Sequence, residues 1–305
     1  MGNKEEGQYV PETEERKAIE WADPFQTVLV DVDSCLAGIE GIDLLADMHG
    51  KKQEVEGLTA AAMNGEIPFD KVFGKRLDII QPQNRDMEVV AARYIQTLTP
   101  DAFEVIHTLQ EHGIDVWLVS GGYDEAIYPL ARHLGIPQTR VYANHLFFDA
   151  QGNYAGLDAQ NPLSGKSGKL ALIENLRVKR EISGKFGIVG DGASEVETHP
   201  VVDLCVGFGG HVARERVMNE ADVFIEEKTF AALLPLLLGR RGVEECIRYY
   251  PHARQLMRTG LDNLARALFQ RRALGWDKDV ALWRGGVDDT VFDPEYPVPP
   301  VWNRK

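Results

Sequence analysis

The sequence predicts an α/β protein in which a mostly parallel sheet carries helices on both faces. Three short apolar runs, at residues 28–30, 116–119 and 186–189, contain β-branched residues and have the length of buried strands. Segments with helical spacing alternate with these runs, and repeated strand–helix units are typical of a parallel sheet. A chain of 305 residues is also long enough to bury a sizeable core.

The overall composition narrows the classes of function. Hydrophobic residues make up 44% and charged residues 26% of the chain, as in an ordinary globular protein. The 47 acidic residues outnumber the 33 basic ones, so the net charge of −14 argues against a general nucleic-acid-binding function. Three cysteines without a CxxC pair favour neither a disulfide framework nor a zinc site. Without an apolar run of about 18 residues we expect no membrane contact, and the polar N-terminus favours a cytoplasmic location.

Changes in patterning along the chain predict four parts. Residues 1–24 are polar and acidic and are expected to form a flexible lead-in. Residues 25–39 and 98–230 carry the strand–helix alternation and are expected to form the core. Residues 40–97 show only helical patterning, which predicts a helical cap inserted after the first strand. Residues 231–305 are expected to form a helical C-terminal extension.

Within the core, each expected element is bounded by a glycine or a turn. Helices are expected at residues 101–112, 124–134 and 170–176, and further short strands at residues 141–143, 146–148, 204–207 and 223–225. The extension differs, because it carries eight arginines between Arg240 and Arg272 and helical spacing at Leu261, Leu264, Ala265 and Leu268. These arginines are candidates for a homo-oligomer contact, for a partner site, or for an ordinary solvated helix face.

Two carboxylates, Asp31 and Asp33, stand where the first strand should end. They are two residues apart, so a continuing strand would direct both to the same side. Ligands of open α/β sheets bind outside the carboxyl ends of the strands. Paired carboxylates there can hold a hard cation, and one of them can attack an electrophile. The alternative is a turn or a helix cap, which aspartate and serine also favour.

Chemically useful groups also follow the second and third strands. Ser120 and Gly121 offer a hydroxyl and an unobstructed backbone N–H before a helix, which suits a phosphate oxygen. Asp191 follows the third strand, and Lys166 or Lys169 can deliver an ammonium group from the segment before it. Each group alone is more often part of a turn or a solvated surface. Their joint occurrence at successive strand ends favours a functional site.

These motifs resemble those of the haloacid dehalogenase (HAD) superfamily, and more narrowly the phosphoserine phosphatases. Asp31-Val32-Asp33 matches the first motif, Ser120 the second, a lysine the third, and Gly190-Asp191-Gly192 the fourth. The resemblance spans about residues 27–230 and includes the cap. It implies a Rossmann-like, three-layer parallel sheet and a small phosphate ester as the substrate.

The resemblance also implies roles for the residues at the strand ends. Asp31 would be the nucleophile, and Asp33 the general acid and base. Mg²⁺ would be held by Asp31, by Asp191 and by the backbone carbonyl of Asp33, with Glu195 reaching the metal shell directly or through water. Ser120, the Gly121 N–H and a lysine would hold the phosphoryl oxygens. Lys169 has the spacing closer to the family's, and Lys166 remains the alternative.

A second set of matches concerns the rest of the substrate. Glu40 would lie near the substrate amino group, and Arg76 would bind its carboxylate, for which a planar guanidinium is well suited. Met63 and Phe69 match the substrate-facing pattern of the cap, and Ser194 matches a hydroxyl residue close to the substrate. The alternatives are that Glu40 caps a helix and that Arg76 forms a surface ion pair.

Two positions depart from the family's pattern. Cys35 stands where the family usually has threonine, and Glu195 stands where it usually has aspartate. A thiol is a poorer hydrogen-bond donor than a hydroxyl, and the simplest role for Cys35 is that of a small buried apolar residue.

From these matches we expect a Mg²⁺-dependent phosphomonoesterase that hydrolyses O-phosphoserine through an aspartyl-phosphate. The alternatives are phosphatase or phosphotransferase action on another small phosphate ester, or a weakly active regulatory or binding protein of the same fold.

Overall fold

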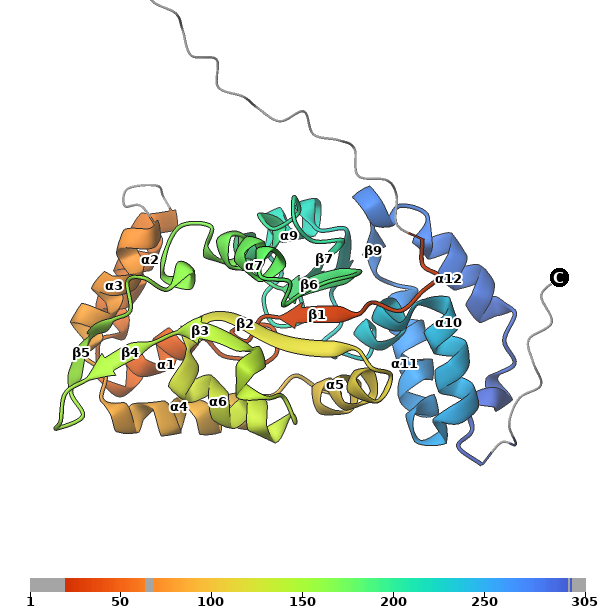
Figure 1. Ribbon diagram of the computed structural model, residues 1–305, viewed down its shortest axis with the longest axis horizontal. Coiled ribbons are helices and arrows are strands. Elements are labelled where there is room, and N and C mark those ends of the chain that lie inside the picture. The colour runs from red at the N-terminus through yellow and green to blue at the C-terminus, as the bar shows by residue number, and fades with distance from the viewer. Residues whose placement is uncertain (1–19, 64–68, 296, 298–305) are drawn as a thin grey trace, which may run out of the picture.

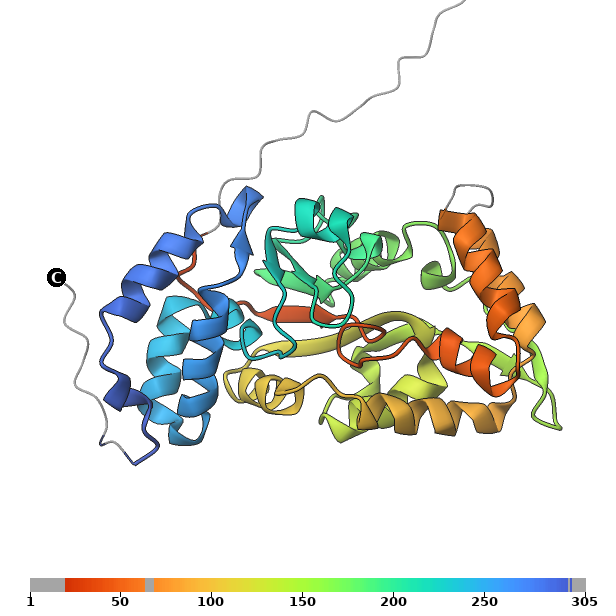
Figure 2. The same ribbon diagram turned by 180° about the vertical axis from the view of Figure 1, so that it is seen from behind.

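The computed structural model describes residues 20–63, 69–295 and 297 of the chain. A central sheet forms the middle of an elongated molecule, with helices α2 and α3 at one end and α10, α11 and α12 at the other (Figures 1 and 2). Residues 1–19, most of the expected lead-in, lie outside the described part. None of the described helices is long and apolar enough to cross a bilayer.

The main sheet has seven strands in the order β3-β2-β1-β6-β7-β8-β9. All neighbouring strands are parallel except β8 and β9, which pair antiparallel. The strands are β1 (Thr27–Val30), β2 (Asp115–Tyr123), β3 (Val141–Asn144), β6 (Phe186–Gly190), β7 (Leu204–Phe208), β8 (Val223–Ile225) and β9 (Leu268–Phe269). The prediction of a Rossmann-like α/β fold with a mostly parallel sheet is therefore confirmed.

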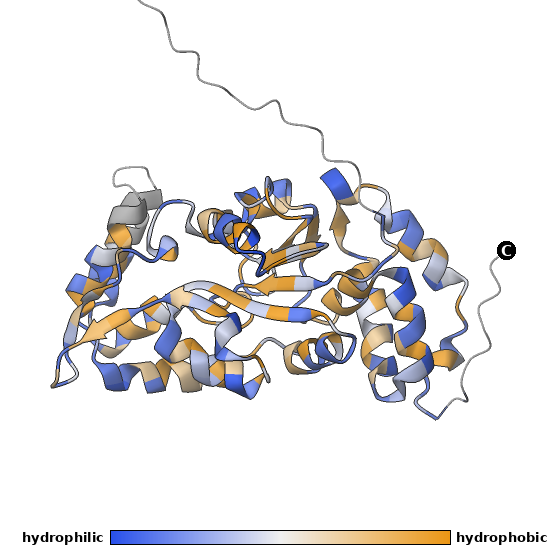
Figure 3. Ribbon diagram, in the orientation of Figure 1, coloured by the Kyte–Doolittle hydropathy of each residue, from blue (hydrophilic) through white to orange (hydrophobic). Residues whose placement is uncertain are grey.

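Helices cover both faces of this sheet, which gives three layers. Val28 and Val30 belong to one hydrophobic cluster and Leu29 to another, because successive side chains of a strand point to opposite faces. The first cluster includes residues of α5 (Ala102–Glu111), α6 (Asp124–His133) and α10 (Leu233–Tyr249), and the second includes residues of α7 (Gly168–Val178). The apolar colouring of the central strands in Figure 3 reflects this burial on both faces.

In the described part of the chain, residues 40–97 form four of the five helices between β1 and β2, as their helical patterning predicts. They are α1 (Gly41–Met48), α2 (Lys52–Met63), α3 (Phe69–Ile80) and α4 (Asn84–Gln96). A separate hairpin of β4 (Leu146–Phe148) and β5 (Tyr154–Leu157) reaches the same region, because the Asn84 N–H donates to the Gly152 carbonyl at 2.9 Å. The sequence predicts β4 and its turn but not β5.

The remaining described helices lie between strands or, for η4, α12 and η5, after the last strand. They are α8 (Ala193–Val196), α9 (Glu215–Glu220), α11 (Arg254–Leu264), α12 (Trp276–Gly285) and the 3₁₀ turns η1 (Gln138–Arg140), η2 (Pro162–Ser164), η3 (Pro251–Ala253), η4 (Arg271–Ala273) and η5 (Asp289–Phe292). Leu268 was expected to continue a helix with Leu261 and Leu264, but it lies in β9 at the edge of the sheet. The extension is therefore not entirely helical.

The end of the expected lead-in is packed rather than flexible. Trp21 is buried, and its indole N–H donates to the Pro235 carbonyl in α10 at 3.0 Å. The large apolar surface of an indole is removed from water only when another element packs against it, and here α10 does so. The boundary at residue 24 is therefore too late for the described residues. The division into core, cap and extension stays a prediction about folding units.

One buried ion pair ties the extension to the sheet. Arg272 donates from Nη2 to Asp222 Oδ2 at 2.7 Å and from Nη1 to the Val202 carbonyl at 2.6 Å. Asp222 is fully buried and also accepts from the Cys205 N–H. Burial alone would raise the pKa of Asp222, but the neighbouring His199 and Arg272 outweigh it and lower the pKa to about 2. At least this arginine is a structural anchor rather than part of a solvated face.

We predict that Asp222→Asn lowers the free energy of unfolding by about 3 kcal/mol at neutral pH, because it leaves a buried guanidinium without its charge partner. The extra free energy of unfolding of the wild type over Asp222→Asn is fully present above the unfolded-state pKa of about 4. It is lost as the pH falls towards the folded-state pKa of about 2. Urea unfolding at several pH values measures both effects. The exposed Asp279→Asn serves as the control and should stay within about 0.5 kcal/mol of wild type. A difference in the free energy of unfolding between wild type and Asp222→Asn that stayed constant as the pH fell would contradict this account.

Candidate active site

Three buried carboxylates meet at the carboxyl ends of β1 and β6. Oxygen atoms of Asp31, Asp191 and Glu195 all lie within 4.8 Å of one another. Asp31 and Asp191 follow neighbouring parallel strands that pair Val30 with Val189, so the register of the sheet brings them together. Glu195 lies one helical turn further on, in α8. Acids that are 160 residues apart in the sequence therefore share one small volume, as predicted for Asp31 and Asp191.

Lys169 lies within this acidic group. Its Nζ donates to Asp31 Oδ1 at 2.6 Å and also to Glu195 Oε1. Gly168 allows this approach, because a Cβ at that position would meet the Leu163 Cα at 2.7 Å. Of the two lysines that the sequence offers, Lys169 is buried in the site, whereas Lys166 is exposed.

Burial and mutual repulsion shape the protonation of the acids. Burial raises the pKa of Asp31 well above its usual value, and Glu195, Asp191 and Asp33 add to the shift, whereas Lys169 opposes it. Burial likewise raises the pKa of Asp191 to about 6, although Arg214 opposes the shift. A bound cation would lower both values, because it favours the ionised carboxylates.

Arg214 is a site residue that sequence reasoning missed. It lies just before α9, in the loop after β7, and its Nη2 and Nε lie 2.9 and 3.0 Å from Asp191 Oδ2. Its Nη2 also lies 3.7 Å from Glu40 Oε1. The available sequence signal was its position after β7, because the carboxyl ends of parallel strands share one edge of the sheet.

Asp33 is held by donors from three distant segments. Its Oδ1 accepts from the Gly41 N–H and from the Tyr94 hydroxyl, both at 2.7 Å, and its Oδ2 accepts from the Ser120 hydroxyl at 3.1 Å. Tyr94 is fully buried in α4 and was not predicted. Gly41 leaves room for that contact, because a Cβ there would collide with the Tyr94 hydroxyl.

The Ser120 segment is shaped for an anion. The Gly122 N–H donates to Ser120 Oγ at 2.9 Å, and a Cβ on Gly122 would come within 2.8 Å of Asp33 Oδ2. The Gly121 carbonyl is fixed by Asn144 Nδ2 at 2.8 Å, and Gly121 itself is exposed. The hydroxyl and the open backbone at Gly121 thus stand beside the carboxylate of Asp33, as the sequence predicts.

The residues expected to bind the rest of the substrate are placed to different degrees. Glu40 accepts from the Ser34 hydroxyl at 2.6 Å, and burial, reinforced by Asp33, raises its pKa to about 7. Glu40 precedes α1, but its side chain does not cap that helix. Ser194 donates to Glu195 Oε1 at 2.9 Å. The side chains of Met63 and Phe69 lie outside the described part of the chain.

Arg76 in α3 is buried, with 9% of its surface exposed, and its guanidinium carbon lies 5.8 Å from the centre of the Phe73 ring. The alternative of a surface ion pair is therefore excluded by its burial.

Cys35 is also fully buried. Burial raises the pKa of its thiol well above the ordinary value, and the charges of Asp31, Asp191 and Glu195 raise it further. A neutral thiol is a weak nucleophile, so the acids account for the chemistry here and Cys35 packs as a small apolar residue. The three cysteines of the chain are all free and buried.

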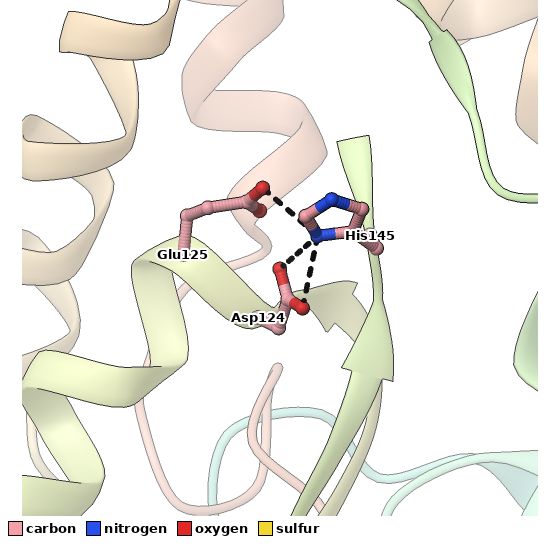
Figure 4. A group of neighbouring side chains, drawn as sticks. All are labelled: Asp124, Glu125 and His145. Atoms are coloured by element: carbon pink, nitrogen blue, oxygen red, sulfur yellow. Dashed lines mark hydrogen bonds and ion pairs between the residues drawn. The ribbon is translucent and has the colours of Figure 1, made fainter. Parts of the chain in front are cut away.

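A second group of acids and a histidine lies outside the predicted site. Asp124 and Glu125 begin α6, and His145 lies just before β4; Figure 4 shows their side chains turned towards one another. His145 Nδ1 lies 3.1 Å from Asp124 Oδ2 and 3.1 Å from Glu125 Oε1. These contacts account for the geometry of the group, and we assign no ligand to it.

The donor set of Asp31, Asp191 and Glu195 fits a divalent metal ion. Hard cations prefer carboxylate oxygens, and three such groups converge in a buried volume. When ionised, the three carboxylates outnumber the two cations that contact them, Lys169 and Arg214, and burial raises the pKa of Asp31 and Asp191. A divalent cation would supply the missing positive charge.

Relatives of known name align with this chain over most of their length. The chain is 38% identical to the phosphoserine phosphatase of Bos taurus over 210 residues, which are 69% of this chain and 92% of the relative. It is 37% identical to the phosphoserine phosphatase of Homo sapiens over 218 residues, 72% of this chain and 95% of the relative. A solved structure described as a phospho-aspartyl intermediate analogue of phosphoserine phosphatase superposes with a TM-score of 0.57 at 27% identity, covering 70% of this chain and 98% of that one.

A family profile described as haloacid dehalogenase-like hydrolase matches residues 28–194. This segment holds β1, the helices that follow it, the strand ends that carry Asp31, Ser120 and Asp191, and the start of α7 with Lys169. With the site geometry and these relatives, the conclusion is direct: the chain belongs to the family of haloacid dehalogenase-like hydrolases.

Proposed function

We propose that the protein hydrolyses O-phosphoserine to serine and inorganic phosphate. The observation that carries this proposal is the convergence of Asp31, Lys169 and Asp191 at one edge of the sheet, with Glu40 nearby, 3.7 Å from the Nη2 of Arg214. Phosphatase relatives align over more than nine tenths of their length. The ligand set and the amino acid-binding residues together favour a small phosphate ester that also carries an amino and a carboxyl group.

The reaction would proceed in two steps on Asp31. A carboxylate oxygen of Asp31 attacks phosphorus, the bond from phosphorus to the serine oxygen breaks, and an aspartyl-phosphate forms. Asp33 gives its proton to the departing serine oxygen and later removes a proton from the water that attacks phosphorus. That second attack breaks the aspartyl–phosphorus bond and releases inorganic phosphate.

The contacts of Asp33 indicate which of its oxygens carries the proton. Oδ1 accepts from two donors, Gly41 N–H and Tyr94 OH, so it is held as an acceptor. Oδ2 accepts only a longer bond from Ser120 among the described residues. When a phosphoryl group engages the Ser120 hydroxyl, Oδ2 becomes the oxygen that can hold and transfer the proton.

We propose Mg²⁺ as the divalent cation, held by carboxylate oxygens of Asp31 and Asp191 and by the backbone carbonyl of Asp33. When bound, Mg²⁺ reduces the repulsion between the anionic nucleophile and the anionic ester. Glu195 would contribute directly or through a water molecule. Its Oε2 already accepts the Gly192 N–H at 2.8 Å, which fixes the orientation of the carboxylate towards Asp31 and Lys169.

Positive and polar groups around Asp31 would hold the phosphoryl oxygens. Lys169 is fixed beside the nucleophile, and its pKa is raised because Asp31 and Glu195 outweigh the effect of burial. It therefore stays charged throughout the neutral range. The Ser120 hydroxyl and the Gly121 N–H would complete the set of donors for charge that shifts onto the phosphoryl group.

The amino acid part of the substrate would lie towards the cap. A substrate ammonium beside Glu40 would favour its ionised form and offset the burial that raises its pKa. The buried Arg76 would take the carboxylate, and Ser194, Met63 and Phe69 would line the same space. We also propose a cytoplasmic location, which the free cysteines support because reducing compartments keep thiols reduced.

We predict that Asp31→Asn lowers kcat for O-phosphoserine by about 10³-fold or more, because an amide cannot form the acyl phosphate. Phosphate release measured with and without added Mg²⁺ provides the test. Wild-type turnover should stop after treatment with EDTA and return when Mg²⁺ is restored. Asp47→Asn, on the exposed face of α1, is the matched control and should retain wild-type turnover. Undiminished hydrolysis by EDTA-treated wild type would remove the metal from the proposal.

We predict an acid limb in the pH profile of kcat/KM that belongs to Glu40. Its pKa is raised to about 7, so it loses its charge, and its attraction for the substrate ammonium, as the pH falls below 7. Glu40→Gln should lower kcat/KM about tenfold at pH 8 and less at lower pH. The ratio of wild-type to variant values cancels the titration of the substrate phosphate. The exposed Glu54→Gln is the control, and a ratio independent of pH would refute this role for Glu40.

We predict that Arg76 distinguishes esters with a carboxylate from those without one. Arg76→Ala should lower kcat/KM for O-phosphoserine about 30-fold relative to O-phosphoethanolamine, because it removes a charged hydrogen-bond partner worth about 2 kcal/mol. Parallel kinetics with the two esters measure this ratio. Arg85→Ala, exposed on α4, is the control. An equal loss for both esters would show that Arg76 acts on something other than the substrate carboxylate.

A further inference from the structure

Two buried donors near the cap have no hydrogen-bond partner among the described residues. They are the hydroxyl of Tyr123 and the Nε of Arg76. Tyr123 is only 1% exposed, and Arg76 is 9% exposed. Leaving a buried polar group unpaired costs about 1–3 kcal/mol, and the hydroxyl of a buried tyrosine usually finds a partner. The two orphaned donors therefore point to an acceptor that the described residues do not supply.

The two donors lie in the same part of the molecule. The Tyr123 ring lies 6.2 Å from the Phe73 ring, and the Arg76 guanidinium lies 5.8 Å from that same ring. Tyr123 ends β2, three residues after Ser120, so its backbone continues the segment that borders Asp33. Phe73 and Arg76 belong to α3 in the cap. Tyr123 and Arg76 thus approach one another from the core and from the cap.

Burial and neighbouring charges determine the pKa of the Tyr123 hydroxyl. Burial raises the pKa of Tyr123, Arg76 opposes the shift, and Asp33 and Asp43 add to it. The phenol therefore stays protonated at neutral pH and can act as a donor. Neither Asp33 nor Asp43 accepts a hydrogen bond from the Tyr123 hydroxyl or from Arg76 Nε.

We propose that the Tyr123 hydroxyl donates a hydrogen bond to the carboxylate of the substrate, beside Arg76. A carboxylate has two oxygens and can accept from a guanidinium and a phenol together. This inference rests on the proposed hydrolysis of O-phosphoserine and adds a specificity-determining residue to it. Tyr123 would help the enzyme to select amino acid phosphates over simpler phosphate esters.

The variant Tyr123→Phe tests the proposal, because it removes the hydroxyl and keeps the ring that packs on Phe73. We expect KM for O-phosphoserine to rise about tenfold, with kcat changed less than about threefold, as for the loss of one hydrogen bond to a charged group. The ratio of kcat/KM for O-phosphoserine to that for O-phosphoethanolamine should fall about tenfold. A general folding defect would lower both esters equally and leave this ratio unchanged.

Tyr142→Phe is the matched control. Tyr142 lies in β3, the neighbour of β2, and its hydroxyl donates to the exposed Glu181 at 3.0 Å. It should leave the ratio at the wild-type value. The double variant Arg76→Ala with Tyr123→Phe should lose less than the product of the two single losses if both groups bind one carboxylate. A Tyr123→Phe ratio equal to wild type, in an enzyme that does hydrolyse O-phosphoserine, overturns this inference alone. If the wild type does not hydrolyse O-phosphoserine at all, the proposed function fails instead.

Discussion

Three carboxylates confined to one buried volume impose the constraint on which the site depends. Asp31, Asp191 and Glu195 repel one another, and burial adds the cost of removing their charges from water. Lys169 and Arg214 offset part of this repulsion from two sides, through Asp31 and Asp191 respectively. The fold holds these groups together because adjacent parallel strands end side by side, and the three acids outnumber the two cations that contact them.

Close packing around the acids explains how the chain uses a glutamate where its family usually has an aspartate. The longer side chain of Glu195 folds back over Gly190, and a Cβ there would lie 2.5 Å from its carboxyl carbon. The Gly192 N–H then binds one carboxylate oxygen, while Lys169 and Ser194 bind the other. The extra methylene is thus accommodated by the glycines of the fourth motif, so the carboxylate still points into the acidic group.

How far the sequence predicts this protein depends on how local each signal is. The strands β1, β2 and β6 are predictable because burial on both faces leaves an uninterrupted apolar run. By contrast, β9 has two residues, and its Leu268 is 47% exposed, so its pattern could equally continue a helix.

The site follows the same rule. Asp31, Ser120, Lys169 and Asp191 each stand beside a predictable strand or motif, whereas Tyr94 reaches Asp33 across 61 residues from the last turn of α4. Arg214 follows a strand that carries no other signal. Tertiary packing alone makes the Tyr94 contact visible, whereas for Arg214 its position after β7 was an available signal.

The extension is connected to the site through the sheet. Its helices lie at the opposite end of the molecule from α2 and α3 (Figure 2), so it cannot touch a substrate held below the cap. Instead β9 pairs with β8 and covers what would otherwise be an open sheet edge, a common route to unwanted pairing between chains. Arg272 then locks this strand to the core through Asp222, and Asp222 in turn holds the Cys205 N–H in β7. Since β7 lies between β8 and β6, the edge that the extension protects belongs to the same sheet that sets the position of Asp191.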